Sequence, residues 1–384
     1  MRKKVLRILM ISPAFRPIVG GYERAAERLS SALCRAGYRV TVITERRDNK
    51  WPRKEVVDQL KVVRLWCVYR KGIHVLTSLM SFAIFLLLRG CRYHVFHVHQ
   101  YGYHAALAVA VGRLLRKPVL IKVPSTSTEG IAPALASSKF SRPMMALHRA
   151  VSACIVTSTD AAREAVQLGI PEERIKLLPN GIDIDEFRPA TSAEKLRIRI
   201  RLGITRSLVV LYSGRLVAFK NVGGLLESWR EIHRDVDAVL LIVGDGPLRS
   251  TLEAKCRFLG LVSSVRFIGQ QSDVIPWYQV ADVFVLSSRY EGLSNSLLEA
   301  MSCGLPVAST RVSGSVDIFA DVDIGELTAP GDTEAMSTSL TRLLADPARR
   351  AACGSRARAY AQEKYSINSV AQYTSALYEH LVSR

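Results

Sequence analysis

The sequence lacks the features that mark several common classes of protein. Its seven cysteines are an odd number, are scattered along the chain and include no C-x-x-C pair. This pattern argues against a disulfide framework or a zinc site and favours a reducing compartment. No apolar run reaches the roughly 20 residues that a membrane-spanning helix needs. The run Val5–Ile11 is interrupted by Arg7 and has no small-residue cleavage site, so we expect a first strand rather than a signal peptide.

Acidic residues are scarce in the first half of the chain, which carries the whole charge excess. Residues 1–180 contain 30 Lys and Arg against 11 Asp and Glu, whereas residues 181–384 contain 23 of each, so the net charge of +19 lies before residue 181. Nucleic acid or an anionic membrane surface could attract this charge. The basic residues are dispersed, and no zinc finger, RNA-binding aromatic motif or basic-region helix accompanies them, which makes nucleic acid the weaker alternative.

One apolar segment lies in the same basic half. Residues 75–88 (VLTSLMSFAIFLLL) are apolar apart from one Thr and two Ser. The segment can form a helix packed on a sheet. It can also form a helix that rests in the headgroup layer of a membrane, with Arg70, Lys71, Arg89 and Arg92 at its ends. The sequence leaves both interpretations open.

Short β-branched runs alternate with helical patterns along most of the chain. With continuous apolar strands, this alternation predicts α/β domains whose parallel sheets are covered by helices on both faces. It starts afresh after Pro189, so we expect two doubly wound domains with a boundary at residues 179–189 (PNGIDIDEFRP). The expected strands are Val5–Ile11, Val40–Thr44, Val62–Leu65, Val95–Val98, Val119–Val123, Cys154–Thr157, Ile175–Leu178, Leu208–Ser213, Ala238–Val243, Val265–Ile268, Val283–Leu286 and Pro306–Ser309. The expected helices are Gly21–Arg35, Ile73–Arg89, His104–Leu115, Asp160–Leu168, Val222–Arg234, Leu248–Leu259, Asp273–Gln279 and Ser296–Cys303, with three more in residues 333–384.

The residues after the predicted strand Val283–Leu286 carry the strongest chemical pattern. A glycine and small polar residues lead from Glu291 into an apolar helical pattern that contains Glu299. A tight loop before a helix offers backbone N–H groups and the positive end of the helix dipole to a diphosphate. Glu299 would lie about one turn into the helix, within reach of a ribose diol, and Glu291 could accept hydrogen bonds from sugar hydroxyls. Spacing alone also fits a surface loop with two ordinary glutamates.

The stretch from Glu291 to Glu299 resembles the E-x7-E signature of glycosyltransferase family 4, whose members are retaining enzymes with the two-domain GT-B fold. Other segments are similar to the family in the same order along the chain, so the resemblance covers the whole sequence. These segments are PIVGGYE at 17–23, GIP at 169–171 through NGID at 180–183 to Phe187, SGRL at 213–216 followed by Lys220 and Asn221, GDGP at 244–247, RFIG at 266–269 and CGLPV at 303–307.

The resemblance implies a GT-B fold with two Rossmann-like domains that face each other across a cleft. The expected domains are an acceptor-binding domain at residues 1–184, a nucleotide-sugar-binding domain at 185–365, and a C-terminal helix at 366–384 that packs back on the first domain. The implied activity is metal-independent hexosyl transfer, with retention, from a nucleotide-diphosphate sugar to a lipid-linked or glycan acceptor. It would serve bacterial-type surface polysaccharide, lipopolysaccharide or glycolipid synthesis. We expect no cofactor, no nucleic-acid partner and a cytoplasmic location, peripheral on the inner face of the plasma membrane.

The resemblance also assigns roles to individual residues. Arg215 and Lys220 would stabilise the charge that develops on the departing diphosphate, and Glu291 would hold the sugar. Gly20 and Gly21 would permit close backbone approach, but they are not part of a G-x-G-x-x-G nicotinamide fingerprint. The implied donor-binding residues are Gly20, Gly21, Gly214, Leu293, Ser294, Asn295 and Glu299.

The sequence departs from the family after the strand Val119–Val123. Many relatives carry there a histidine that approaches the transferred sugar, whereas this chain has Pro124, which can neither shuttle a proton nor donate a hydrogen bond. The transfer therefore cannot depend on that histidine. Lys122 and Ser125 are possible substitutes. The remaining candidates for sugar or acceptor contact, at the carboxyl end of an earlier strand, are His99 and Gln100.

Metal ligands find little support in the sequence. Three Asp-x-Asp pairs occur, but none ends a strand in the first half, so we interpret them as chance or local turn residues: Asp183/Asp185, Asp235/Asp237 and Asp321/Asp323. His97 and His99 share a face of one strand, yet no third ligand with convincing spacing accompanies them, which favours packing or a lining role. A GT-B-fold epimerase or phosphorylase stays an alternative function, and a nucleic-acid-binding protein a weaker one.

Overall fold

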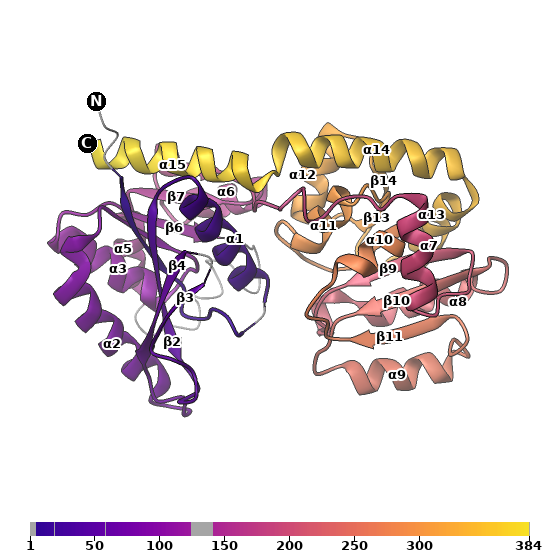
Figure 1. The fold of residues 1–384 in the computed structure, drawn as a ribbon, viewed down its shortest axis with the longest axis horizontal. Coiled ribbons are helices and arrows are strands. Elements are labelled where there is room, and N and C mark those ends of the chain that lie inside the picture. Colours follow the sequence, from indigo (N-terminus) through magenta and orange to yellow (C-terminus); the bar gives the residue numbers. More distant parts are fainter. Residues whose placement is uncertain (1–4, 19, 58, 124–140, 384) are drawn as a thin grey trace. The chain divides into compact units, whose positions relative to one another are not determined.

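The chain folds into two compact α/β units. The computed structural model describes residues 5–18, 20–57, 59–123 and 141–383, without the side chains of residues 141 and 142. One unit comprises Met1–Gly181 together with Ile367–Arg384, and the other comprises Ile182–Ser366. The C-terminal helix therefore belongs to the first unit, although the whole second unit precedes it in the sequence (Figure 1).

The first unit is built on a sheet that has eight strands in the described part of the chain. Its strand order is β3-β4-β2-β1-β5-β6-β7-β8, and the neighbours are parallel except for the edge pair β3 and β4. The strands are β1 (Arg7–Ile11), β2 (Arg39–Arg46), β3 (Lys54–Val57), β4 (Leu60–Trp66), β5 (Val95–Val98), β6 (Val119–Val123), β7 (Ala153–Val156) and β8 (Ile175–Leu177). The helices are α1 (Gly21–Arg35), α2 (His74–Arg89), η1 (Gly90–Arg92), α3 (Tyr103–Leu114), α5 (Ser141–Arg149), α6 (Thr159–Gln167), η3 (Glu172–Arg174) and α15 (Ile367–Ser383).

Both faces of this sheet are buried. Successive residues of a strand point to opposite sides of the sheet, so neighbouring residues of β1 pack on different faces. Leu9 packs with Phe82 of α2 on one face, while Met10 packs with Tyr378 of α15 on the other. Helix α15 lies beside α1, and its Tyr378 hydroxyl is 2.5 Å from Nδ1 of His97 on β5. The C-terminal helix is thus part of the hydrophobic core of the first unit.

The second unit contains a parallel sheet with six strands among the described residues, in the order β11-β10-β9-β12-β13-β14. Buried clusters cover both of its faces. The strands are β9 (Leu208–Ser213), β10 (Ala238–Val243), β11 (Val265–Gly269), β12 (Val283–Leu286), β13 (Val307–Thr310) and β14 (Gly325–Thr328). The helices are α7 (Ser192–Arg201), η4 (Ala218–Lys220), α8 (Val222–Ile232), α9 (Arg249–Phe258), α10 (Ile275–Val280), α11 (Asn295–Ser302), α12 (Ser313–Asp321), α13 (Thr333–Ala345) and α14 (Pro347–Lys364). The expectation of two doubly wound parallel sheets is confirmed.

Helix α2 has one buried face and one exposed apolar face. Ser78, Phe82 and Leu86 are buried against the first unit, so the packing interpretation of this segment holds for that side. The opposite side exposes a stripe of large apolar side chains: Ile73, Leu76, Met80, Ile84, Leu87 and Leu88. Within the described residues, His74–Arg92 is the single helical stretch that is long and apolar enough to cross a membrane, although a helix packed on its own unit along one side meets those criteria as well.

Candidate active site

The carboxyl ends of β9 and β12 lie side by side in the second unit, because these strands are neighbours in its parallel sheet. The loops that follow them are fastened together: the Ser287 hydroxyl donates to the Lys220 carbonyl over 2.8 Å, and the Arg289 amide donates to the Phe219 carbonyl over 2.7 Å. The rings of Phe219 and Tyr290 stack with centroids 5.2 Å apart. The two loops therefore form one structure, which positions side chains from both strand ends.

Lys220 and Glu291 are in direct contact at this edge. The ammonium of Lys220 donates to a carboxylate oxygen of Glu291, and both side chains are mostly buried, with 11% and 18% of their surface exposed. The Ser288 hydroxyl also donates to Glu291, over 3.2 Å. The structure thus brings together two of the three predicted catalytic residues, from segments 71 residues apart.

Arg215 belongs to the same edge. Its carbonyl accepts a hydrogen bond from the Tyr212 hydroxyl over 3.1 Å, and its side chain is exposed. Burial and the Glu291 carboxylate raise the pKa of Tyr212, while the Arg215 guanidinium lowers it. Both charges therefore act on the buried phenol of Tyr212, so Arg215 and Glu291 both lie near the end of β9.

Glycines allow the strand ends to pack this closely. Gly214 follows β9, and its amide donates to the Val243 carbonyl at the end of β10 over 3.0 Å. Gly244 has a φ of +131°, and a side-chain carbon there would overlap the Gly214 carbonyl. A larger residue at Gly244 would push the backbone before Arg215 out of place, so the glycine fixes the position of the predicted diphosphate-binding segment.

The loop before α11 forms the other side of the predicted donor site. Its cap residue, Ser294, makes no side-chain cap hydrogen bond to α11, and the first-turn N–H groups of a helix are suited to an anionic acceptor. Leu293 and Ser294 are buried, while Asn295 begins the helix. Gly314 of α12 donates its amide to the Gly292 carbonyl over 3.0 Å and supports the loop from behind.

Glu299 lies five residues into α11 and is only 3% exposed. One of its oxygens accepts a hydrogen bond from the Tyr278 hydroxyl over 2.8 Å. Burial and the neighbouring carboxylate hold the pKa of Tyr278 well above its ordinary value, and the nearby Ser213 side chain lowers it in part. Tyr278 of α10 thereby holds Glu299 of α11. Sequence reasoning missed this residue, because a tyrosine in a short apolar helix reads as ordinary core.

The candidates that the structure describes in the first unit lie at the start of α1 and near the carboxyl ends of β5 and β6. Gly20 caps the N-terminus of α1 and Gly21 begins it, as the glycine loop predicted. His99 and Lys122 are 4% and 3% exposed. Burial lowers the pKa of His99 well below its ordinary value, and the charges of His97 and Lys122 lower it further. Burial lowers the pKa of Lys122 to about 8. Gln100 is exposed, and Pro124 and Ser125 lie outside the described residues.

The residues that the sequence assigned to packing, lining or local turns make contacts within their own segments or with nearby side chains. His97 stacks on His99 with ring centroids 4.4 Å apart and packs under α15, which is the packing role expected of it. The first member of the 183/185 pair accepts the amide of the second over 3.2 Å, as in a turn. The other two Asp-x-Asp pairs make side-chain contacts with Arg206, Ser207, Tyr360 and Arg356.

The fold defines a two-unit α/β protein with a cluster of charged residues at one sheet edge, and comparison with known proteins identifies its class. The sequence model of the family described as "Glycosyl transferases group 1" matches residues 194–360, and that of "Glycosyltransferase Family 4" matches residues 19–186. The two models match successive parts of the chain, which therefore belongs to the group 1, family 4 glycosyltransferases and has the GT-B fold.

Similar proteins match either nearly the whole chain or about half of it. An uncharacterized glycosyltransferase of Methanocaldococcus jannaschii is 29% identical over 97% of this chain and 98% of its own length. A GDP-mannose-dependent alpha-(1-6)-phosphatidylinositol monomannoside mannosyltransferase of Mycolicibacterium smegmatis is 35% identical over 51% of this chain and 53% of its own. The solved structure of Anabaena HepE in complex with UDP-glucose covers 98% of this chain and 100% of that one, with a TM-score of 0.80 and 18% identity. That likeness shows the fold.

Proposed function

We propose that the protein transfers a hexose from a nucleotide-diphosphate sugar to a lipid-linked or glycan acceptor, with retention of anomeric configuration and without a catalytic metal. The observation that carries the proposal is the cluster of Arg215, Lys220 and Glu291 beside the N-terminus of α11. A related structure in complex with UDP-glucose supports the donor class.

The departing nucleoside diphosphate gains negative charge as the sugar–oxygen bond breaks, so the site must supply positive charge that is already in place. Arg215 and Lys220 provide two cations, and the first-turn amides of α11 add the positive end of a helix dipole. These groups take the part that a divalent cation plays in metal-dependent transferases. Loss of either cation should lower kcat about 10²- to 10³-fold.

Retention follows if the acceptor attacks from the side that the diphosphate leaves. The acceptor oxygen then bonds to the anomeric carbon as the sugar–oxygen bond breaks, and the acceptor proton passes to an oxygen of the diphosphate. This route needs no histidine after β6, in keeping with Pro124. Glu291, fixed by Lys220 and Ser288, would hold the sugar hydroxyls rather than act as a nucleophile.

A panel of nucleotide sugars tests the donor class directly. We expect one of the UDP-, GDP- or ADP-sugars to raise the melting temperature and to release its nucleotide when an acceptor is present. The anomeric proton coupling of the product should match that of the donor, and a chelator should leave the rate unchanged. An epimerase would convert the sugar nucleotide without releasing it, and a phosphorylase would require inorganic phosphate.

The acceptor is proposed to be membrane-bound, and the exposed stripe of α2 supports this. Leu76, Met80 and Ile84 expose 61%, 51% and 55% of their surface along one side of the helix. Arg70 and Arg89 lie at its two ends, and both are exposed. An apolar stripe with basic ends fits a helix lying in an anionic headgroup layer, where each basic residue contributes about 1 kcal/mol. The mannosyltransferase relative acts on a phosphatidylinositol mannoside, and we propose an inner-membrane glycolipid or surface-glycan pathway on the cytoplasmic side.

Vesicle binding tests the membrane proposal. The protein should sediment with vesicles that contain anionic phospholipid at low salt and less so with neutral vesicles. Leu76→Glu together with Ile84→Glu should weaken binding at least tenfold, because two apolar side chains leave the interface and two negative charges enter it. Phe258→Glu is the matched control, since this side chain is 89% exposed on α9 of the other unit. Equal loss in both variants would contradict the assignment of the surface to α2.

A further inference from the structure

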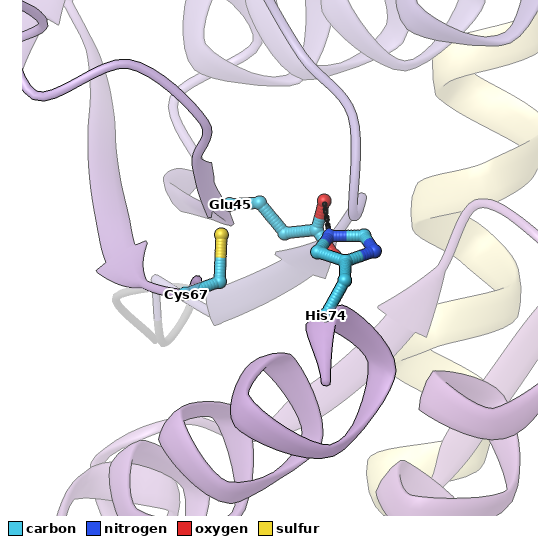
Figure 2. Close-up of side chains that lie close together, drawn as sticks. All are labelled: Glu45, Cys67 and His74. Atoms are coloured by element: carbon cyan, nitrogen blue, oxygen red, sulfur yellow. Dashed lines mark ion pairs between the residues drawn. The ribbon is translucent and has the colours of Figure 1, made fainter. Parts of the chain in front are cut away.

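Three different ligand-bearing side chains meet at the carboxyl edge of the first sheet. Glu45 lies near the end of β2, Cys67 follows β4, and His74 is the first residue of α2 (Figure 2). Their carboxylate oxygen, sulfur and ring nitrogen all lie within 4.8 Å of one another. The tetrahedral geometry of zinc, with Zn–N near 2.0 Å and Zn–S near 2.3 Å, places ligand atoms roughly 3.3 to 3.8 Å apart. A shift of about 1 Å would complete the set.

Glu45 is held as a metal-bound carboxylate usually is. Its side chain is 1% exposed, and each of its oxygens has a donor: Nε of Arg47 lies 2.8 Å from Oε2, and the Ser78 hydroxyl lies 2.7 Å from Oε1. Ser78 in turn contacts Nε2 of His104 over 2.8 Å. Hydrogen bonds of this kind orient ligating carboxylates from the outer side.

His74 provides an independent observation. Its Nε2 is shielded from solvent and lies 3.1 Å from Oε2 of Glu45, yet the two atoms do not form a hydrogen bond, and Nε2 has no other hydrogen-bond partner among the described residues. An imidazole nitrogen and a carboxylate oxygen 3.1 Å apart that are not aligned for a hydrogen bond have a spacing close to that of two ligands of one zinc ion.

We propose that Glu45, Cys67 and His74 bind a zinc ion, with water at the fourth position. A thiolate, an imidazole and a carboxylate form the mixed ligand set that Zn²⁺ accepts, whereas Mg²⁺ and Ca²⁺ require oxygen ligands throughout. Two anionic ligands balance the ion, and Arg47 remains as an outer partner of the carboxylate. The ion would join β2, the connection after β4 and the start of α2, so its role is to fix the end of the helix with the exposed apolar stripe. The transfer chemistry does not use it.

Metal analysis of the full chain tests the proposal. After treatment with a chelator, incubation with ZnCl₂ and extensive dialysis, the wild type should retain about one zinc per chain, and zinc should raise its melting temperature. Substitution with Co²⁺ should produce a thiolate-to-cobalt charge-transfer band. Cys67→Ser should abolish that band and weaken zinc binding at least tenfold. Cys91→Ser, which removes an exposed cysteine of the same unit, should change neither.

Two results of the metal analysis would overturn the proposal. One is a wild type that retains no zinc under these conditions. The other is zinc retention or a cobalt band that Cys67→Ser and Cys91→Ser affect equally. Glu45→Gln offers a second route, because the amide keeps the size of the buried carboxylate while removing its charge, and its circular dichroism spectrum reports whether the unit still folds. A folded Glu45→Gln variant that binds zinc as the wild type does would also refute the assignment.

Discussion

Replacement of Tyr278 by phenylalanine removes the hydroxyl that holds Glu299 of the candidate site from the neighbouring helix α10. The ring is fully buried, so phenylalanine keeps its packing. The hydroxyl donates to the buried Glu299 carboxylate over 2.8 Å. A lost hydrogen bond to a charged group costs about 1.5 to 3 kcal/mol, since the buried carboxylate loses a donor that water does not replace.

This energy corresponds to a measurable change in melting temperature. For a unit of this size, 1 kcal/mol shifts the melting temperature by about 2 to 4 °C, so Tyr278→Phe should melt roughly 3 to 12 °C lower than the wild type. Nucleotide-sugar affinity should also fall, because Glu299 is no longer held in one orientation. Differential scanning calorimetry and isothermal titration with the best donor measure the two effects.

Tyr360→Phe is the matched control. The Tyr360 hydroxyl also donates to a carboxylate, Asp321, over 2.5 Å in the same unit, but at the surface. Water can replace that donor, so the melting temperature should change by no more than about 2 °C. If Tyr278→Phe melts and binds nucleotide as Tyr360→Phe does, the reasoning about the buried carboxylate is wrong.

Three further predictions concern turnover, loop packing and acid stability. Glu291→Gln should depress kcat about 10²-fold while nucleotide affinity changes little, and an unchanged rate in steady-state assays would remove Glu291 from the site. Gly314→Ala should raise KM for the donor and lower the melting temperature, because a Cβ there would lie 2.5 Å from the Gly292 carbonyl. Gly223→Ala is the matched control, since its Cβ would meet no atom closer than 3.6 Å and its backbone, like that of Gly314, has no positive φ. Burial lowers the pKa of His148 to about 4, whereas a histidine in the unfolded chain takes up a proton near pH 6.5. The contribution of neutral His148 to the free energy of unfolding should therefore be complete above pH 6.5 and decrease toward pH 4, by about 2 kcal/mol at pH 5. His148→Phe should remove that part of the acid loss in denaturant titrations, and an identical pH profile would contradict this origin.

Periodicity predicted the elements that are apolar and buried. Helix α1 (Gly21–Arg35) and strand β9 (Leu208–Ser213) have the predicted bounds, since their apolar residues recur with the period of a helix and a buried strand. The elements that were missed are polar or short. Strand β3 pairs antiparallel at an edge, and α7 has no fully buried residue and begins with a Thr191–Glu194 capping box.

The candidate site was predictable as a set of loops but not as a set of contacts. Glycine spacing and the resemblance to the family located Gly214, Arg215 and the loop before α11. The pairing of Lys220 with Glu291, and that of Tyr278 with Glu299, depend on which strands are neighbours and on the depth of each side chain. Local sequence does not contain that information. The same holds for Glu45, Cys67 and His74, whose spacing matches no metal-binding motif.

The discontinuous first unit has a consequence for synthesis of the protein. When residues 1–181 have left the ribosome, the face of their sheet that α15 covers still lacks Tyr378 and its neighbours, and it must stay uncovered until Ile182–Ser366 has been made. The second unit, by contrast, is continuous and can complete its core at once. A nonsense mutation that removes only the last 18 residues would therefore damage the half of the protein that was translated first, and it would leave an apolar sheet face open to chaperones and proteases.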